Sequence, residues 1–220
     1  MPLSDYKDLV GTVASYAAIA QMLSGTIVCR NFARQGTTRG MPPTMFVMGG
    51  TLGVVLVEFA RIMKDAAMLR ANRAIMLLNL GYLACYWYYC DDRPLFYRTL
   101  TKATVLAAGL LTYARLEDPA VVEFRFGAVL TVLFFFLVAS PLFSLREIIR
   151  TKNSISIPLP MVLSGTVVTL LWLLYGLMIG SAFLIFQNVI VLVLSVAQLG
   201  LVIIYPRTLP PEESKGVDYL

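Results

Sequence analysis

The sequence contains no histidine, and few of its side chains are charged. Only 14% of the 220 residues are Asp, Glu, Lys or Arg, against about a quarter in ordinary soluble domains. Without histidine, the chain lacks the commonest general base and the commonest metal ligand of proteins. Its three cysteines, Cys29, Cys85 and Cys90, contain no CxxC pair and form no disulfide framework. We therefore expect no enzyme, no metal site and no cofactor.

Apolar residues are abundant instead, and they occur in long runs. They make up 58% of the chain, and about 20 helical residues span a hydrocarbon core. The net charge of +5 comes from Lys and Arg scattered singly between the runs, which is typical of membrane edges and not of a nucleic-acid-binding surface. The sequence predicts an all-α integral membrane protein with seven transmembrane helices, at approximately 7–29, 43–63, 66–89, 97–115, 121–144, 160–180 and 182–205.

The ends of a seven-span chain lie on opposite sides of the membrane. The first run follows MPLSDY, which has no basic segment, so we expect it to remain as a helix and not to be removed as a signal peptide. The excess of Lys and Arg on one side places the N-terminus outside and a flexible tail, 206–220, in the cytosol. We expect the plasma membrane, with the Golgi or another endomembrane as the alternative.

The chain also repeats itself at a spacing of 116 residues. The matching pairs are mostly not leucines: Ser24 with Ser140, Arg30 with Arg146, Pro42 with Pro158, Gly49 with Gly165, and Asn72 with Asn188. Residues 7–89 and 121–205 are then two three-helix bundles, which the extra helix at 97–115 makes parallel (3+1+3). Parallel repeats related by an axis along the membrane normal are typical of transporters with a central substrate path.

Four strings of the second repeat carry a family resemblance. RTKNSISIPLPMVLSG, WLLYG, FQNVIVLVLSVAQL and YP, in this order and spacing, resemble the second half of a SWEET sugar transporter, and RQGTTRGMPP is similar to the first half. The resemblance implies passive, bidirectional transport of mono- or disaccharides by alternating access. Residues 97–115 would be the inversion linker helix. A homo-oligomer is an option that the sequence leaves open.

The same resemblance places four hinge prolines at Gly25, Pro42, Pro141 and Pro158, so that glycine replaces one of them. A proline inside a helix removes a backbone donor and produces a kink, whereas glycine bends a helix less rigidly. For each proline alone, a structural kink that only shapes packing is the favoured explanation. Their matched placement in both repeats favours paired hinges.

Asn72 and Asn188 lie deep within apolar runs at equivalent positions of the repeats. A buried amide needs partners, and it can donate to and accept from neighbouring sugar hydroxyls at once. The resemblance places the family's sugar-contacting asparagines here, a stacking aromatic at Trp172, and a small residue at Gly53 whose missing side chain widens the pocket. Interhelical hydrogen bonding is the alternative for the asparagines, and an interfacial belt for Trp172.

Tyr175 and Gly176 resemble the family's outer constriction, with Phe59 and Ala60 at the equivalent places of the first repeat. An aromatic beside a small residue can open or close a pore through small helix movements. Ordinary helix packing is the alternative for each of these residues.

A few charges do not fit the repeat. In the alignment of the two repeats, the positions of Glu58, Arg70 and Arg73 are taken by apolar residues in the second copy. Charges at membrane depth usually pair or face water. We expect Glu58 to pair with Arg73 or with Arg61. Alternatively, Glu58 carries protons in a coupled transporter, or the arginines attract an anionic substrate.

Two other classes remain as alternatives. A PQ-loop carrier of amino acids or another small solute would typically have Pro-Gln at the first kink of each unit, where this chain has Ser24-Gly25 and Ser140-Pro141. A seven-helix receptor agrees with the span count but not with the duplication.

Overall fold

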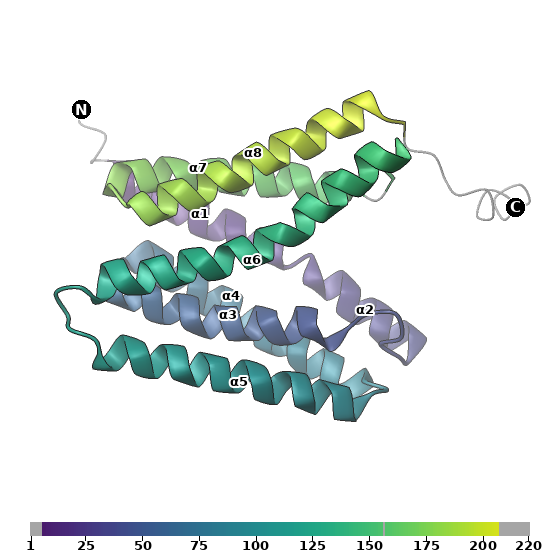
Figure 1. Cartoon of the computed structure of the whole chain (residues 1–220), viewed down its shortest axis with the longest axis horizontal. Coiled ribbons are helices and arrows are strands. Elements are labelled where there is room, and N and C mark those ends of the chain that lie inside the picture. Colours follow the sequence, from purple (N-terminus) through teal and green to yellow (C-terminus); the bar gives the residue numbers. More distant parts are fainter. Residues whose placement is uncertain (1–5, 156, 207–220) are drawn as a thin grey trace, which may run out of the picture. The chain divides into compact units, whose positions relative to one another are not determined.

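The computed structural model describes residues 6–155 and 157–206, without the side chains of 136–144. Every regular element in these ranges is a helix, as expected. The predicted tail lies outside the described residues, apart from Pro206. The elements, shown in Figure 1, are α1 (Lys7–Met22), α2 (Gly25–Gln35), α3 (Pro43–Ile62), α4 (Ala66–Tyr89), α5 (Arg93–Leu116), α6 (Val122–Thr151), α7 (Leu159–Ile179) and α8 (Ala182–Ile204).

Fewer helices than predicted are apolar enough to cross a membrane by length and composition. In the described part of the chain there are four such segments: Lys7–Gln35, which joins α1 and α2, and the helices α3, α7 and α8. Helices α4 and α5 are long enough, at 24 residues each. Their polar residues lower the mean hydropathy, for example Arg70 and Arg73 in α4 and Arg98 and Lys102 in α5. The seven-span arrangement therefore stays a prediction.

Local sequence explains where several helices begin. The Asp65 carboxylate accepts a hydrogen bond from the Met68 N–H at 2.8 Å before α4, and Asp92 accepts one from the Leu95 N–H at 2.9 Å before α5. Side-chain acceptors of this kind satisfy a backbone donor that has no partner inside the helix. Pro42 and Pro158 are the residues immediately before α3 and α7.

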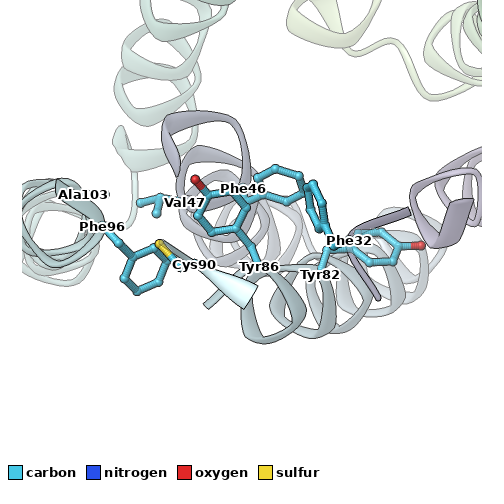
Figure 2. Packing of buried hydrophobic residues seen from close by; sticks show 8 residues of the cluster. All are labelled: Phe32, Phe46, Val47, Tyr82, Tyr86, Cys90, Phe96 and Ala103. Atoms are coloured by element: carbon cyan, nitrogen blue, oxygen red, sulfur yellow. The ribbon is translucent and has the colours of Figure 1, made fainter. Parts of the chain in front are cut away.

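The chain divides into two compact units, residues 1–129 and 130–220. In the first unit, α3 packs along α4 and α5, while α4 also contacts α1 and α2. Aromatic rings hold one end of this unit together (Figure 2): the Tyr86 ring stacks on Phe46, with centroids 4.8 Å apart, and on Phe96, at 6.0 Å. The Tyr86 hydroxyl donates to the Met41 carbonyl at 2.9 Å. This cluster ties the loop between α2 and α3 to α4.

An ion pair fixes the turn from α5 to α6. The Arg125 guanidinium donates to both carboxylate oxygens of Glu117, at 3.1 Å each. A hydrogen bond from the Tyr113 hydroxyl, followed by the bond from Arg125, lowers the pKa of Glu117. The carboxylate is therefore held in its charged form at the end of α5.

In the second unit, α7 packs along α8. Helix α7 ends at Ile179, and the next residue, Gly180, has a left-handed φ of 69°, a conformation that glycine adopts readily. The Ser181 side chain then accepts from the Leu184 N–H at 3.4 Å and begins α8. The short turn makes the two helices antiparallel neighbours.

Candidate functional site

The two predicted sugar-contacting asparagines lie half-buried in α4 and α8, one in each unit. The Asn72 Nδ2 donates to the main-chain carbonyl of Leu56 in α3, at 3.4 Å. The Asn188 Nδ2 donates to the Leu184 carbonyl of its own helix, at 2.8 Å. Each side chain is thus oriented by one main-chain acceptor.

Each amide keeps hydrogen-bonding capacity beyond that bond. A side-chain amide has two N–H donors and an acceptor oxygen, and within the described residues only one donor of Asn72 and one of Asn188 is engaged. Neither Oδ1 accepts a hydrogen bond from another described residue. A ligand hydroxyl can therefore donate to either oxygen and accept from the second N–H.

Trp172 and Tyr175 are one turn apart on α7, the helix that packs along α8. Their rings meet edge to face, with centroids 5.7 Å apart and planes at 83°. Tyr175 is 2% exposed, whereas Trp172 is only half-buried. The buried ring therefore supports Trp172, whose accessible part offers an apolar surface for stacking.

Gly53 has a different structural role from the one expected. It is buried in α3, and a Cβ added there would lie 3.0 Å from the Met76 Cα and 3.1 Å from the Met76 Cβ. The missing side chain does not widen a pocket at this point, because Met76 of α4 fills the space. Glycine is needed here so that α3 and α4 can approach closely.

The predicted gate residues are also buried. Phe59 is 5% exposed, and its ring centroid lies 6.3 Å from that of Phe126. A Cβ on Gly176 would lie 3.3 Å from the main-chain nitrogen of Ile185, so Gly176 lets α7 approach α8. Packing accounts for these residues as the structure places them, and their action as a gate stays a prediction.

The hinge positions fall at three kinds of place. Pro42 and Pro158 precede α3 and α7, with φ of −72° and −75°. A kink inside a helix was expected there, but a proline just before a helix interrupts no internal hydrogen bond. Pro141 lies along α6, among residues whose side chains are outside the described set. Gly25 is the first residue of α2, where the first predicted span is broken.

The expected ion pair of Glu58 is confirmed with Arg61. The Arg61 Nη1 lies 2.9 Å from the Glu58 Oε2, at i,i+3 spacing on α3. In the described residues no group of three Cys, Asp or Glu side chains gathers as metal ligands. Beside Asn72 on α4, the Arg70 guanidinium donates to the Thr12 hydroxyl at 3.5 Å.

A family model described as "Sugar efflux transporter for intercellular exchange" matches the chain twice, at residues 8–93 and 124–209. The two matches begin at residues 8 and 124, hence 116 residues apart, which is the spacing of the internal repeat.

Individual relatives agree with this match. The chain is 30% identical to "Sugar transporter SWEET1" of Drosophila pseudoobscura pseudoobscura over 96% of its own length and 93% of that protein's. It is 23% identical to "Sugar transporter SWEET1" of Caenorhabditis elegans, over 86% of this chain and 62% of that protein. It is 24% identical to "Bidirectional sugar transporter SWEET10" of Arabidopsis thaliana, over 79% of this chain and 62% of that protein.

The fold is similar to that of a eukaryotic SWEET transporter solved at 3.7 Å resolution. The TM-score is 0.78 at 21% sequence identity, and the similarity covers 90% of this chain and 96% of the solved one.

Proposed function

Since this chain belongs to the SWEET family of sugar transporters, which are not enzymes, we propose that it moves mono- or disaccharides across a membrane passively, in both directions, by alternating access. The observation that carries the proposal is the pair Asn72 and Asn188. They occupy equivalent positions of the two family-model matches, and neither amide oxygen accepts a hydrogen bond from another described residue.

The chemistry of these side chains suits an uncharged substrate with hydroxyl groups. Each amide can donate a hydrogen bond to one sugar hydroxyl and accept a hydrogen bond from another. The Trp172 ring can cover an apolar C–H face of the sugar. A net hydrogen bond contributes about 0.5–1.5 kcal/mol, and part of the sum offsets the freedom that the sugar loses on binding, so a few such bonds give weak binding. Weak binding of this kind lets the sugar leave on either side, and the concentration gradient alone then sets the direction of flux.

Alternating access requires the two halves to move about defined points. In the proposal, residues 7–89 and 121–205 are the moving bundles and 97–115 is the linker. Gly25, Pro42, Pro141 and Pro158 are the hinges, while Phe59, Tyr175 and Gly176 close the outer end. The breaks before α2, α3 and α7 support this assignment, because a helix end can swing without losing internal hydrogen bonds.

The ion pair of Glu58 argues against a proton-coupled carrier. Glu58 already has a partner, because the Arg61 Nη1 lies 2.9 Å from its Oε2, and charged residues of membrane helices usually pair or face water. We therefore propose that the pair stabilises the end of α3 and that transport needs no ion gradient. The N-terminus is proposed to lie outside, with the tail in the cytosol and the plasma membrane as the location.

A panel of solutes tests the substrate class. Purified protein in liposomes should take up radiolabelled glucose or sucrose without any ion gradient, since the amides and Trp172 suit neutral polyols. A neutral amino acid and an organic anion should enter no faster than into protein-free liposomes. Uptake of the anion or the amino acid in place of every sugar would contradict the proposed substrate class.

A further inference from the structure

The first predicted span is broken between α1 and α2, as Figure 1 shows. In a continuous α-helix, each N–H bonds to the carbonyl four residues earlier. Here the Thr26 N–H bonds to the Leu23 carbonyl at 3.0 Å, three residues back, and the Ser24 N–H bonds to that of Gln21 at 3.1 Å. The Met22 carbonyl has therefore lost its usual helical partner, Thr26.

Tyr82 of α4 supplies the missing donor. Its hydroxyl donates to the Met22 carbonyl at 2.9 Å, across 60 residues of sequence. The Thr26 hydroxyl adds a second bond to the Leu23 carbonyl at 2.6 Å. Because an unpaired carbonyl is costly within a bilayer, the Tyr82 hydroxyl stabilises the broken form of the span.

The Tyr82 ring also occupies the space that a side chain at residue 25 would need. A Cβ added to Gly25 would lie 2.5 Å from the ring Cε2 and 2.8 Å from Cζ. Figure 2 shows the Tyr82 ring pointing away from Phe96. Tyr82 itself is 9% exposed and belongs to the buried hydrophobic cluster drawn in Figure 2. Gly25 is thus required by Tyr82 and not only by local backbone geometry.

We infer that Tyr82 is a positioning residue for the first hinge, and that Gly25 and Tyr82 together replace the hinge proline. The equivalent positions 116 residues later are Pro141 and Gln198, so the two halves differ at both members of the pair. A proline interrupts a helix by its own ring, which removes a backbone N–H. The break at Gly25 and Tyr82 depends instead on one hydrogen bond between two helices. When that bond is lost, the Thr26 N–H can bond to the Met22 carbonyl as in a continuous helix, and the span straightens.

The geometry of the hinge can be measured without any transport. Spin labels at Val13 in α1 and Ala33 in α2, both exposed, report the distance across the break in a variant without its native cysteines. A straight α-helix would separate these positions by about 30 Å. Tyr82→Phe, which removes only the hydroxyl, should shift the distance distribution from a shorter value towards about 30 Å.

Tyr86→Phe is the matched control for this measurement. It lies one turn further along α4 and also removes a hydroxyl that donates to a main-chain carbonyl, that of Met41, at 2.9 Å. It should leave the distance between residues 13 and 33 unchanged. An unaltered distance in Tyr82→Phe, or the same change in both variants, would overturn the inference.

A second experiment, which rests on the proposed function, tests the hinge by measuring the rate of sugar exchange. Gly25→Pro alone should slow exchange about tenfold or more, because its ring collides with Tyr82. Tyr82→Ala alone should also slow it, because the Met22 carbonyl loses its partner. In the double variant, the rate of sugar exchange should return to within about threefold of that of the original protein. The proline then has room and interrupts the helix by itself. Trp172 fluorescence in a Trp87→Phe background should show unchanged sugar affinity.

The outcomes of the two experiments are separable. A double variant no faster than the slower single variant would mean that a proline with room at residue 25 does not replace the Gly25–Tyr82 pair, and the inference would be wrong. If the spin-label distance shifts as expected but no sugar moves with any variant, the hinge assignment stands and the proposed function fails.

Discussion

Asn188→Ala is expected to abolish hexose transport by the purified protein, with the initial rate in liposomes reduced about tenfold or more. The variant loses the Oδ1 and the second N–H of the Asn188 amide, neither of which bonds to another described residue. Two lost hydrogen bonds amount to about 1–3 kcal/mol, and 1.4 kcal/mol is about tenfold in a rate or binding constant. Initial uptake of radiolabelled glucose, normalised to the amount of inserted protein, measures the effect.

The adjacent residue on α8 provides the control. The Gln187 Nε2 donates to the Thr131 hydroxyl at 3.3 Å, so Gln187→Ala also removes an amide that has an assigned hydrogen bond within the second unit. It should lower thermal stability slightly and leave uptake within about twofold. Equal losses of uptake in both variants would show that the Asn188 effect comes from folding, and full uptake by Asn188→Ala would remove the amide from the path.

Gly53→Val is expected to have the largest effect on stability. Even a Cβ at residue 53 meets the Met76 main chain at 3.0 Å, so the valine must push α3 away from α4. Overpacking of this kind costs about 1–3 kcal/mol, occasionally more, which corresponds to a fall of about 5 °C or more in the unfolding midpoint. Thermal unfolding of the detergent-solubilised protein, followed by fluorescence-detected size exclusion, measures it.

Gly109→Val is the matched control, because a Cβ at Gly109 of α5 meets no atom within 4 Å. Its unfolding midpoint should stay within about 2 °C of the original. If Gly53→Val instead keeps its stability and only weakens sugar binding, Gly53 lines the pocket as first expected, and the helix-contact explanation is wrong.

The positions of the helices follow closely from local sequence. The apolar runs 43–63 and 66–89 correspond to α3 (Pro43–Ile62) and α4 (Ala66–Tyr89). These elements were predictable because a run of apolar residues, a proline at the start or an acidic residue before it acts within a few residues of chain. The pairing of Glu58 with Arg61 was predictable for the same reason, since i,i+3 side chains on a helix are neighbours.

The features that were missed depend on residues distant in sequence. The break in the first span needs Tyr82, 60 residues away from Met22, and no local pattern connects them. The role of Gly53 depends on Met76 of the next helix. Family resemblance marked Gly25 and Gly53 as special positions, but only the packing of α4 against its neighbours shows why each is glycine.

In the described part of the chain, four of the seven predicted spans meet the requirements of length and composition, and α4 shows why others do not. The prediction treated helices with internal polar residues as equal to fully apolar ones, and α4 carries Arg70, Asn72, Arg73 and Asn79. Polar residues within a membrane helix usually face a path or a partner helix, so α4 combines a less apolar composition with the proposed sugar contact at Asn72. A composition threshold does not recognise such a helix.

Sugar counterflow tests most directly whether this chain is a passive carrier. Liposomes loaded with unlabelled sugar are diluted into a trace of the same labelled sugar, with ion gradients collapsed by ionophores. The labelled sugar should rise inside above its outside concentration for a time and then fall back to equality, because an alternating-access carrier exchanges one sugar for another. Simple equilibration without the transient rise, or no labelled sugar inside unless a proton gradient is restored, would contradict the account.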